Sequence, residues 1–478
     1  MSTPSVSYSI TVRLELPPRP SAVSTLTTAV EDQGGLVTAV DVSASESDVL
    51  QIDLTIATGG EVDAERIVEV LRTVDGVVIR RVSDRVFLAH LGGKLTIESR
   101  VPIRHRDDLS LVYTPGVARV SKQVAEHPED ARRLTIKRNT VAVVSDGSAV
   151  LGLGNIGPYG ALPVMEGKAA LFKRFADIDA FPLCLDTQDT EEIIRVVKAV
   201  APVFAGINLE DISAPRCYEI EARLREELDI PVFHDDQHGT GIVATAALTN
   251  ALTVVGKRMA DVRVVLSGAG AAGSAVLRMM LAAGVEHVTV VDVEGVIYEG
   301  RPGLHPSLDW IARSTNRRGL RGTLSDAIVG ADVFIGVSAP DILTVEDIQR
   351  MAPDPIVFAM ANPTPEIDPA LAAQHAAVVA SGRSDFANQC NNVLAFPGVF
   401  RGLLDAHSSR VTDEMLLAAS RALAAVVTPE ELNATYVIPS VFHPDVHEVV
   451  ARAVREVAER LEREAGAPAV GADGPGAR

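Results

Sequence analysis

Two pairs of adjacent acidic residues indicate metal chemistry in this sequence. Glu210-Asp211 and Asp235-Asp236 each come directly after a short apolar run that is typical of a strand. Four carboxylates at the ends of neighbouring strands repel one another, and this crowding is unfavourable unless a cation offsets it. The pattern therefore predicts a site for a hard divalent cation where two strands end.

Three of these acids are the candidate metal ligands: Glu210, Asp211 and Asp236. Three carboxylates that leave positions open for water or substrate suit Mg²⁺ or Mn²⁺. His234 and His238 raise the question of zinc, but zinc sites use more nitrogen or sulfur, so we expect both histidines to lie behind the ligands or in the core. The structural alternative for the acids is capping of the helices that follow.

A glycine-rich motif further along predicts a dinucleotide site. Gly268, Gly270 and Gly273 follow a strand-like run and open a helical pattern, with Ala271 and Ala272 among them. The first glycine permits the tight turn, the second lets the backbone approach the pyrophosphate, and the third lets helix and strand pack closely. We expect all five residues to line the cofactor site.

Asp292 ends the next expected strand, where an acid binds the ribose 2′-OH of a dinucleotide. Glu294 follows, and residues 293–295 contain no Lys or Arg, so a 2′-phosphate would meet two acids. The sequence therefore favours NAD over NADP. NADP stays the alternative, because a more distant base such as Arg313 could reach the site.

Five more residues could take part in chemistry. Lys168 lies at an expected helix start within an apolar stretch, where burial lowers the pKa of a lysine and lets it act as a base. Tyr113 lies in a rigid Tyr-Thr-Pro-Gly turn and could donate a proton nearby. Asn362, Asn391 and Asn392 could bind carboxylate or nicotinamide groups, although Asn is common in turns. Alone, a lysine at a helix end is usually solvated and a tyrosine is usually core.

The elements that must position these residues form several α/β units, since 478 residues are too many for one core. Residues 1–88 show the β-α-β-β-α-β order of a ferredoxin-like domain and carry no catalytic cluster. Residues 89–257 begin with a basic connector and alternate strands and helices. Residues 258–463 have the pattern of a Rossmann-type doubly wound sheet. Residues 464–478 are rich in Ala, Gly and Pro, and we expect them to be disordered.

Composition excludes several classes of function. A net charge of -19 argues against nucleic acid and an anionic membrane surface as partners. The three cysteines are far apart, so neither a disulfide framework nor a Cys-x-x-Cys metal site is expected. The first residues carry no secretory signal, and no run is long and apolar enough for a membrane helix. We expect a cytoplasmic protein.

Seven motifs together resemble the malic enzyme family. The resemblance extends over about residues 95–440, and the N-terminal unit resembles an ACT domain, a small regulatory module, mainly by its topology. The motifs occur in family order: Tyr113-Thr114-Pro115-Gly116, Gly152-Leu153-Gly154-Asn155-Ile156-Gly157, Glu166-Gly167-Lys168, Asn208-Leu209-Glu210-Asp211, His234-Asp235-Asp236-Gln237-His238-Gly239-Thr240, Gly268-Ala269-Gly270 and Ala361-Asn362-Pro363-Thr364.

The resemblance implies oxidative decarboxylation of L-malate to pyruvate and CO₂, with hydride transfer to the nicotinamide. It implies that Lys168 takes the proton of the C2 hydroxyl, that Asp235 tunes the pKa of Lys168, and that Tyr113 protonates the enolate at C3. It assigns Mn²⁺ or Mg²⁺ to the three acids as a Lewis acid. Substrate and nicotinamide would be oriented by Asn362 and by Asn391 or Asn392.

One departure and two alternatives accompany this reading. Larger, animal-type malic enzymes use an arginine for the malate carboxylate where this chain has Ala149, so which group replaces it stays open. The alternatives are an enzyme that prefers NADP and a catalytically silent nucleotide-binding sensor that works through its N-terminal domain. The family also implies a homodimer or higher homo-oligomer, and the N-terminal unit suggests a small-molecule effector.

Overall fold

The computed structural model describes residues 4–45, 48–150 and 152–465, and the chain divides into two compact units, Met1–Thr96 and Ile97–Arg478. The sequence placed this boundary at residue 88. The difference arises because a short helix, α3 (Arg85–His90), follows the last strand of the first unit and contacts two of its strands. Of the tail expected at residues 464–478, all but the first two residues lie outside the described residues.

The first unit has the element order predicted from its sequence. A four-stranded antiparallel sheet of order β2-β3-β1-β4 packs against two helices through a core of aliphatic side chains. Its elements are β1 (Ser5–Leu16), α1 (Ala22–Glu31), β2 (Leu36–Ser45), β3 (Leu50–Thr58), α2 (Glu61–Thr73) and β4 (Val78–Asp84).

The second unit begins with three helices that bury none of their residues, and then enters a four-stranded parallel sheet of order β6-β5-β7-β8. The helices are α4 (Arg106–Val112), α5 (Val117–Glu126) and α6 (Ala131–Leu134). The sheet and its helices are β5 (Thr140–Ser145), α7 (Gly157–Ala176), β6 (Asp179–Cys184), α8 (Thr190–Val200), β7 (Gly206–Leu209), α9 (Arg216–Glu227) and β8 (Val232–His234).

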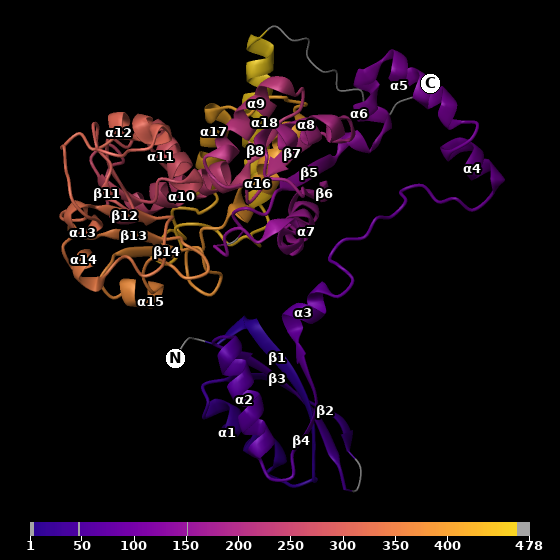
Figure 1. Ribbon diagram of the computed structural model, residues 1–478, viewed down its shortest axis with the longest axis vertical. Coiled ribbons are helices and arrows are strands. Elements are labelled where there is room, and N and C mark those ends of the chain that lie inside the picture. The colour runs from indigo at the N-terminus through magenta and orange to yellow at the C-terminus, as the bar shows by residue number, and fades with distance from the viewer. Residues whose placement is uncertain (1–3, 46–47, 151, 466–478) are drawn as a thin grey trace. The chain divides into compact units, whose positions relative to one another are not determined.

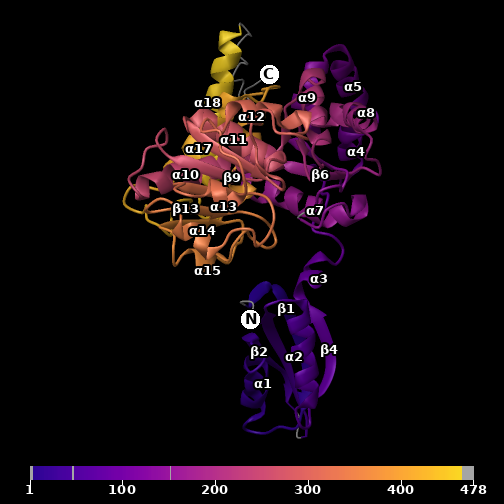
Figure 2. The ribbon, with the colours of Figure 1, turned by 60° about the vertical axis from the view of Figure 1, so that its left-hand side comes forward.

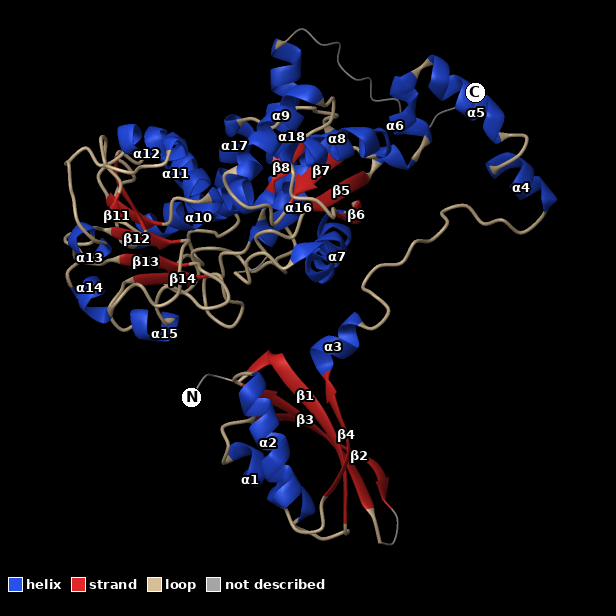
Figure 3. Ribbon diagram, viewed as in Figure 1, coloured by secondary structure: helices blue, strands red, loops and turns tan. Residues whose placement is uncertain are grey.

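A six-stranded sheet follows, in the order β11-β10-β9-β12-β13-β14. Its strands pair in parallel except for β11, as the doubly wound pattern predicted. Figure 3 shows the strands of both parallel sheets flanked by helices. The elements are β9 (Arg263–Ser267), α11 (Ala271–Ala283), β10 (His287–Asp292), β11 (Gly295–Val296), α12 (Asp309–Ser314), α13 (Leu324–Ala327), β12 (Val333–Gly336), α14 (Val345–Gln349), β13 (Ile356–Ala359), α15 (Pro369–Ala372) and β14 (Val378–Ser381).

One long helix, α10 (Asp235–Val254), links the two parallel sheets. It is buried over most of its length and packs against α11 and α17 (Asp413–Ala425), as Figures 1 and 2 show. The helices α16 (Phe396–Asp405) and α18 (Val446–Glu464) contact α7, so one hydrophobic core runs from β5 to the six-stranded sheet. No helix within the described ranges is long and apolar enough to cross a membrane.

Candidate active site

The two pairs of acids meet at the carboxyl ends of β7 and β8. These strands are parallel neighbours, and Leu209 pairs with His234, so the residues that follow each strand lie side by side. Glu210, Asp211 and Asp236 each present a carboxylate oxygen within 4.8 Å of the others. Glu210 and Asp211 are each only 5% exposed. The structure therefore brings all three candidate ligands into one cluster, in which Glu210 and Asp211 are buried and the side chain of Asp236 is 31% exposed.

The charge of this cluster fits a divalent cation. Burial raises the pKa of Glu210 well above its ordinary value, and repulsion from Asp236, Asp235 and Asp211 raises it further, against the attraction of Lys168. Three closely spaced carboxylates with oxygen donors are the set that Mg²⁺ and Mn²⁺ prefer, and a bound cation would offset their repulsion. The residues present therefore fit such an ion.

Lys168 projects from α7 into the same cluster. Its Nζ lies 2.5 Å from Asp235 Oδ2, 2.8 Å from Glu210 Oε1 and 4.3 Å from the ring centroid of Phe396. Burial lowers the pKa of Lys168, but the two carboxylates outweigh it and raise that pKa overall. The lowered pKa that we expected from burial alone is therefore wrong for this structure, since the sequence did not show two acids in direct contact with the amine.

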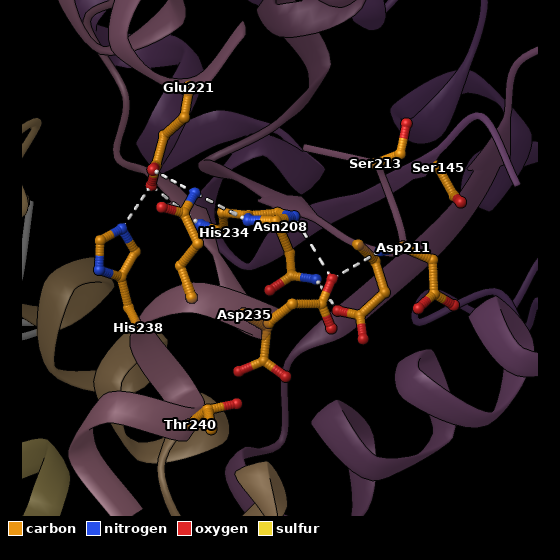
Figure 4. Close-up of polar contacts among 12 residues, drawn as sticks. Ser145, Asn208, Asp211, Ser213, Glu221, His234, Asp235, His238 and Thr240 are labelled. Carbon is orange, nitrogen blue, oxygen red and sulfur yellow. Dashed lines mark hydrogen bonds and ion pairs between the residues drawn. The ribbon is translucent and has the colours of Figure 1, made fainter. Parts of the chain in front are cut away.

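A buried acid that the sequence analysis missed supports the cluster from behind. Glu221 on α9 accepts hydrogen bonds from the backbone N–H of His234 (3.1 Å), from His238 Nε2 (2.8 Å) and from Gln237 Nε2 (3.1 Å), and it pairs with Arg225 at 2.7 Å. Figure 4 shows Glu221 above the two histidines. The only signal in the sequence was an acid on the apolar face of a helix.

His234 connects this support to a ligand. Its Nδ1 is 2.9 Å from Gln237 Nε2, and its Nε2 is 3.3 Å from Asp236 Oδ2. His238 faces Glu221 instead of the three carboxylates. Both histidines thus lie behind the acids, and neither belongs to the group of potential ligands in the described part of the chain.

The loop that carries Asp211 is fixed by backbone contacts and by an unpredicted arginine. Asp211 has a φ of 54°, its N–H donates to Asp236 Oδ2 (2.8 Å), and its carbonyl accepts from the N–H of Ala149 (3.0 Å). Arg216 pairs with the buried Asp146 at 2.9 Å and donates to Ser148 Oγ at 3.0 Å. These contacts tie the loop after β5 to the loop after β7.

The glycine-rich turn has the geometry that its spacing predicted. Gly268 has a φ of 109°, which a side chain would strain. A Cβ added at Gly273 would lie 2.0 Å from the carbonyl oxygen of Gly268, so strand and helix pack there without room for a side chain. A Cβ at Gly270 would meet no atom within 4 Å, which leaves the turn open to a ligand. Ala271 and Ala272 form the first turn of α11.

Asp292 ends β10 as expected, but its carboxylate has a cationic partner. Arg301 Nη1 donates to Asp292 Oδ1 at 2.8 Å, its Nη2 pairs with Oδ2, and its side chain is 8% exposed. We expected no base close to Asp292 and named Arg313 as the distant one. Arg313 instead lies 3.8 Å from Asp309. Arg301 was not predicted because it lies outside residues 293–295, and only the folded structure shows that its side chain contacts Asp292.

The candidate amides occupy different places. Asn392 Nδ2 donates to the carbonyl of Asp235 at 3.3 Å, so it lies beside the acid cluster. Asn391 caps its own turn by accepting the backbone N–H two residues ahead at 2.9 Å. Asn362 follows β13, and a Cβ at Gly152 would lie 2.4 Å from its carbonyl oxygen, so the glycine loop before α7 contacts this turn.

Tyr113 is the predicted site residue that the structure does not bring to the others. It ends α4, its side chain is 66% exposed, and within the described ranges its phenol makes no hydrogen bond. Figure 1 shows α4 and α5 apart from α7 and β7. The acids, Lys168 and the glycine turn therefore form a site to which Tyr113 of the same chain does not contribute in this conformation.

Comparison with known proteins gives one consistent family. Residues 93–225 match the malic enzyme N-terminal domain and residues 237–461 match the malic enzyme NAD binding domain. The chain is 57% identical over 451 residues to an NAD-dependent malic enzyme of Geobacillus stearothermophilus, over 94% of each chain. It is 46% identical to an NADP-dependent malic enzyme of Rhizobium meliloti, over 77% of this chain and 50% of the relative.

A solved structure is also similar. The crystal structure of an NAD-dependent malic enzyme from Thermotoga maritima has a TM-score of 0.75 and 51% sequence identity, and the match covers 78% of this chain and 99% of that chain. The resemblance inferred from the seven motifs is thereby confirmed at the level of the family and the fold.

Proposed function

We propose, because this chain belongs to the malic enzyme family, that it catalyses the oxidative decarboxylation of L-malate to pyruvate and CO₂ with NAD as hydride acceptor. The observation that carries the proposal is the position of Lys168, within 2.8 Å of both Asp235 and Glu210 inside a cluster of buried carboxylates. A base, an electrostatic partner and candidate ligands for a cation thus meet at one point.

The cofactor turn lies within reach of this point. Ala271, at the start of α11, packs against the hydrophobic cluster that contains Leu209 and Ile212, the residues on either side of the Glu210-Asp211 pair. The helices α10 and α11, which begin at the acids and at the glycine turn, pack against each other. Because ligands of a doubly wound sheet bind where its strands end, a nicotinamide bound at this turn can face the acid cluster.

In the proposed reaction, Lys168 in its neutral form takes the proton of the C2 hydroxyl while C2 transfers a hydride to the nicotinamide. A cation held at Glu210 would offset one of the two negative charges that raise the pKa of Lys168. Asp235 holds the ammonium that forms on Lys168. Glu210, Asp211 and Asp236 would hold a divalent cation, which would supply Lewis-acid stabilisation of the negative charge that develops on the substrate. Loss of CO₂ leaves an enolate, and a proton at C3 completes pyruvate. The family resemblance gives this step to Tyr113, which lies exposed and away from the acid cluster in this conformation.

Asp292 and the NAD-dependent relatives support NAD as the cofactor. Arg301, which pairs with Asp292, supports NADP instead. The carboxylate expected to bind the ribose, Asp292, already has a guanidinium partner, and a free guanidinium there would accept a 2′-phosphate. An NADP-preferring enzyme therefore stays the alternative. Cytoplasmic location, a homo-oligomer and an effector for the ACT-like first unit are retained as predictions of the sequence.

A coupled assay tests the proposal. Purified protein is given NAD, Mn²⁺ or Mg²⁺ and a panel of 2-hydroxy acids, with and without EDTA, and NADH and pyruvate are both measured. We expect equal amounts of NADH and pyruvate from L-malate alone, and none with EDTA. Absence of pyruvate would instead favour a silent nucleotide-binding sensor. A tenfold faster initial rate with NADP than with NAD at equal concentration would overturn the preference for NAD.

A further inference from the structure

One guanidinium joins the loops that follow three neighbouring strands of the sheet β6-β5-β7-β8. Arg216 is the first residue of α9, and its side chain is 25% exposed. Its Nη1 pairs with Asp146, which follows β5, and donates to the carbonyl of Gln188, which lies after β6. Its Nη2 donates to Ser148 Oγ, also after β5, and to Ser213 Oγ, after β7, both at 3.0 Å. The side chain thus bridges three loops at the edge of the sheet where the acids lie.

Both terminal nitrogens of Arg216 are committed to the protein. Each carries two N–H groups, and each contacts two acceptors of the surrounding loops. Asp146 is buried, so the ion pair also compensates its charge. The guanidinium is therefore not placed to bind the substrate carboxylate in the way that larger malic enzymes use the arginine at the position of Ala149. It can act on the site through the residues that it holds.

The contacts of Arg216 extend to a candidate metal ligand. Ser148 Oγ accepts from Arg216 and from the backbone N–H of Ser213, the latter at 2.9 Å. The next residue, Ala149, donates its backbone N–H to the carbonyl of Asp211 at 3.0 Å. Asp211 has a φ of 54°, a left-handed conformation that is unfavourable for a residue with a side chain and must be maintained by its surroundings. The turn that presents this carboxylate is therefore fixed by the bonds around Arg216, and Ser213 lies on the same side of the site as Asp211 (Figure 4).

The same arginine is also linked to the glycine loop before α7. Gln188, whose carbonyl accepts from Arg216, exchanges two side-chain hydrogen bonds with Asn155 (3.1 and 2.9 Å). Asn155 lies in the loop that contacts the turn after β13, where a Cβ at Gly152 would lie 2.4 Å from the carbonyl oxygen of Asn362. This loop leads into α7, the helix that carries the expected base. Arg216 thus connects the turn of a candidate ligand with the loop in front of the base.

We propose that Arg216 is a positioning residue that sets the affinity of the acid cluster for a divalent cation by fixing the turn at Asp211. The inference rests on the part of the proposed function that gives Glu210, Asp211 and Asp236 to the cation, and not on the reaction with malate. Groups behind metal ligands orient them, so their loss weakens metal binding. A lysine could keep a charge beside Asp146, but its single nitrogen cannot bridge three loops.

Titration with Mn²⁺ tests the proposal without turnover. The Kd for Mn²⁺ is measured by electron paramagnetic resonance of the unbound ion, and the Kd for NAD by calorimetry. Arg216→Gln should raise the Kd for Mn²⁺ about 10–100-fold. It should leave the Kd for NAD unchanged, because the glycine turn belongs to the other sheet. Arg216→Lys should bind Mn²⁺ as weakly as Arg216→Gln does. Arg223→Gln is the matched control: Arg223 lies on the same helix and pairs with exposed acids such as Glu191, so its loss should leave the Kd for Mn²⁺ at the wild-type value.

Ser148→Ala is the second test, and it decides the question if Arg216→Gln does not fold. It removes the oxygen that lies between Arg216 and Ser213 but keeps the pair of Arg216 with Asp146, so the Kd for Mn²⁺ should again rise. Folding is judged by the Kd for NAD and by the melting temperature in EDTA. A lower melting temperature with an unchanged Kd for Mn²⁺ would show a purely structural role and overturn the proposal.

The remaining outcomes separate this inference from the proposed function. Wild-type affinity for Mn²⁺ in Arg216→Lys would show that charge alone matters, and it would overturn the bridging role. If the wild type binds Mn²⁺ but makes no pyruvate from malate, the proposed reaction fails, and the same titrations still decide the role of Arg216. If the wild type does not bind Mn²⁺, the assignment of the three acids and this inference fail together.

Discussion

Replacement of Lys168 by methionine should destabilise the protein, and a divalent cation should restore part of the loss. The side chain of Lys168 is 11% exposed and is the positive partner of Asp235 and Glu210, which are 0% and 6% exposed. Removal of one partner from a buried ion pair costs about 3–5 kcal/mol, because the remaining charge is buried without compensation. If Asp235 or Glu210 takes up a proton in the variant, the loss of unfolding free energy lies at the lower end of this range.

The expected shift in melting temperature follows from the size of the unit. With an unfolding entropy of about 2.1 cal/mol/K per residue, the unit Ile97–Arg478 should lose roughly 4–6 °C. Mn²⁺ at a hundredfold excess over its Kd should return about 2.7 kcal/mol, since it binds the folded carboxylates. The wild type should gain less from Mn²⁺ if Lys168 competes with the ion for Glu210.

Thermal unfolding in EDTA and in Mn²⁺ measures both effects. Lys173→Met is the control, because Lys173 lies on the same helix and is 55% exposed, and its ion pairs in the described part of the chain are with the exposed Asp177 and the half-buried Asp179. We expect this control to melt close to the wild type in both buffers. Equal melting temperatures for Lys168→Met and the wild type in EDTA, or a gap that Mn²⁺ leaves unchanged, would refute the reasoning.

Three further predictions concern the cofactor turn, the specificity of the site and its support. Gly270→Ala should fold normally and raise the KM for NAD, because its Cβ enters space that a bound cofactor would occupy. Gly273→Ala should be unstable, because its Cβ would lie 2.0 Å from a backbone oxygen. Thermal unfolding and NAD titration distinguish the two variants, and equal effects would count against the predicted roles. Asp292→Ala should remove the main partner of the Arg301 guanidinium, leaving Glu294 at 3.8 Å, and shift the ratio of kcat/KM for NADP over NAD upward about tenfold, or about 1.4 kcal/mol. An unchanged ratio would show that this pair does not face the ribose. Glu221→Gln should cost about 3 kcal/mol of stability at neutral pH: burial opposes the charge, but His238 and Arg225 hold the pKa of Glu221 at about 2. Because this pKa is below its ordinary value, the stability that ionised Glu221 contributes is complete above about pH 4.5 and disappears as the pH falls toward 2. The difference in unfolding free energy between Glu221→Gln and the wild type, measured in urea, should therefore become smaller in acid. A difference that stays constant with pH would contradict the assignment.

Local patterns were enough to predict the doubly wound sheet and the cluster of acids. Strands such as β9 and β8 are short apolar runs whose ends the sequence marks, and parallel strands place their carboxyl ends at one edge. The positions of Glu210 and Asp236 follow from that rule alone. The roles of Gly268 and Gly273 were also predictable. The backbone approaches itself closely in this turn, which involves residues near one another in the sequence and requires that they carry no side chain.

The tertiary structure alone decided which distant groups neutralise one another. Arg301 pairs with Asp292, Glu221 bonds the side chains of His238 and Arg225, and the amine of Lys168 lies between two acids, all through contacts that only the fold creates. A pKa depends on every charge within a few ångströms, and the sequence does not record those distances. The same limit applies to Tyr113: a motif indicates its chemistry, but only the structure shows that its side chain lies exposed at the end of α4 and away from Lys168.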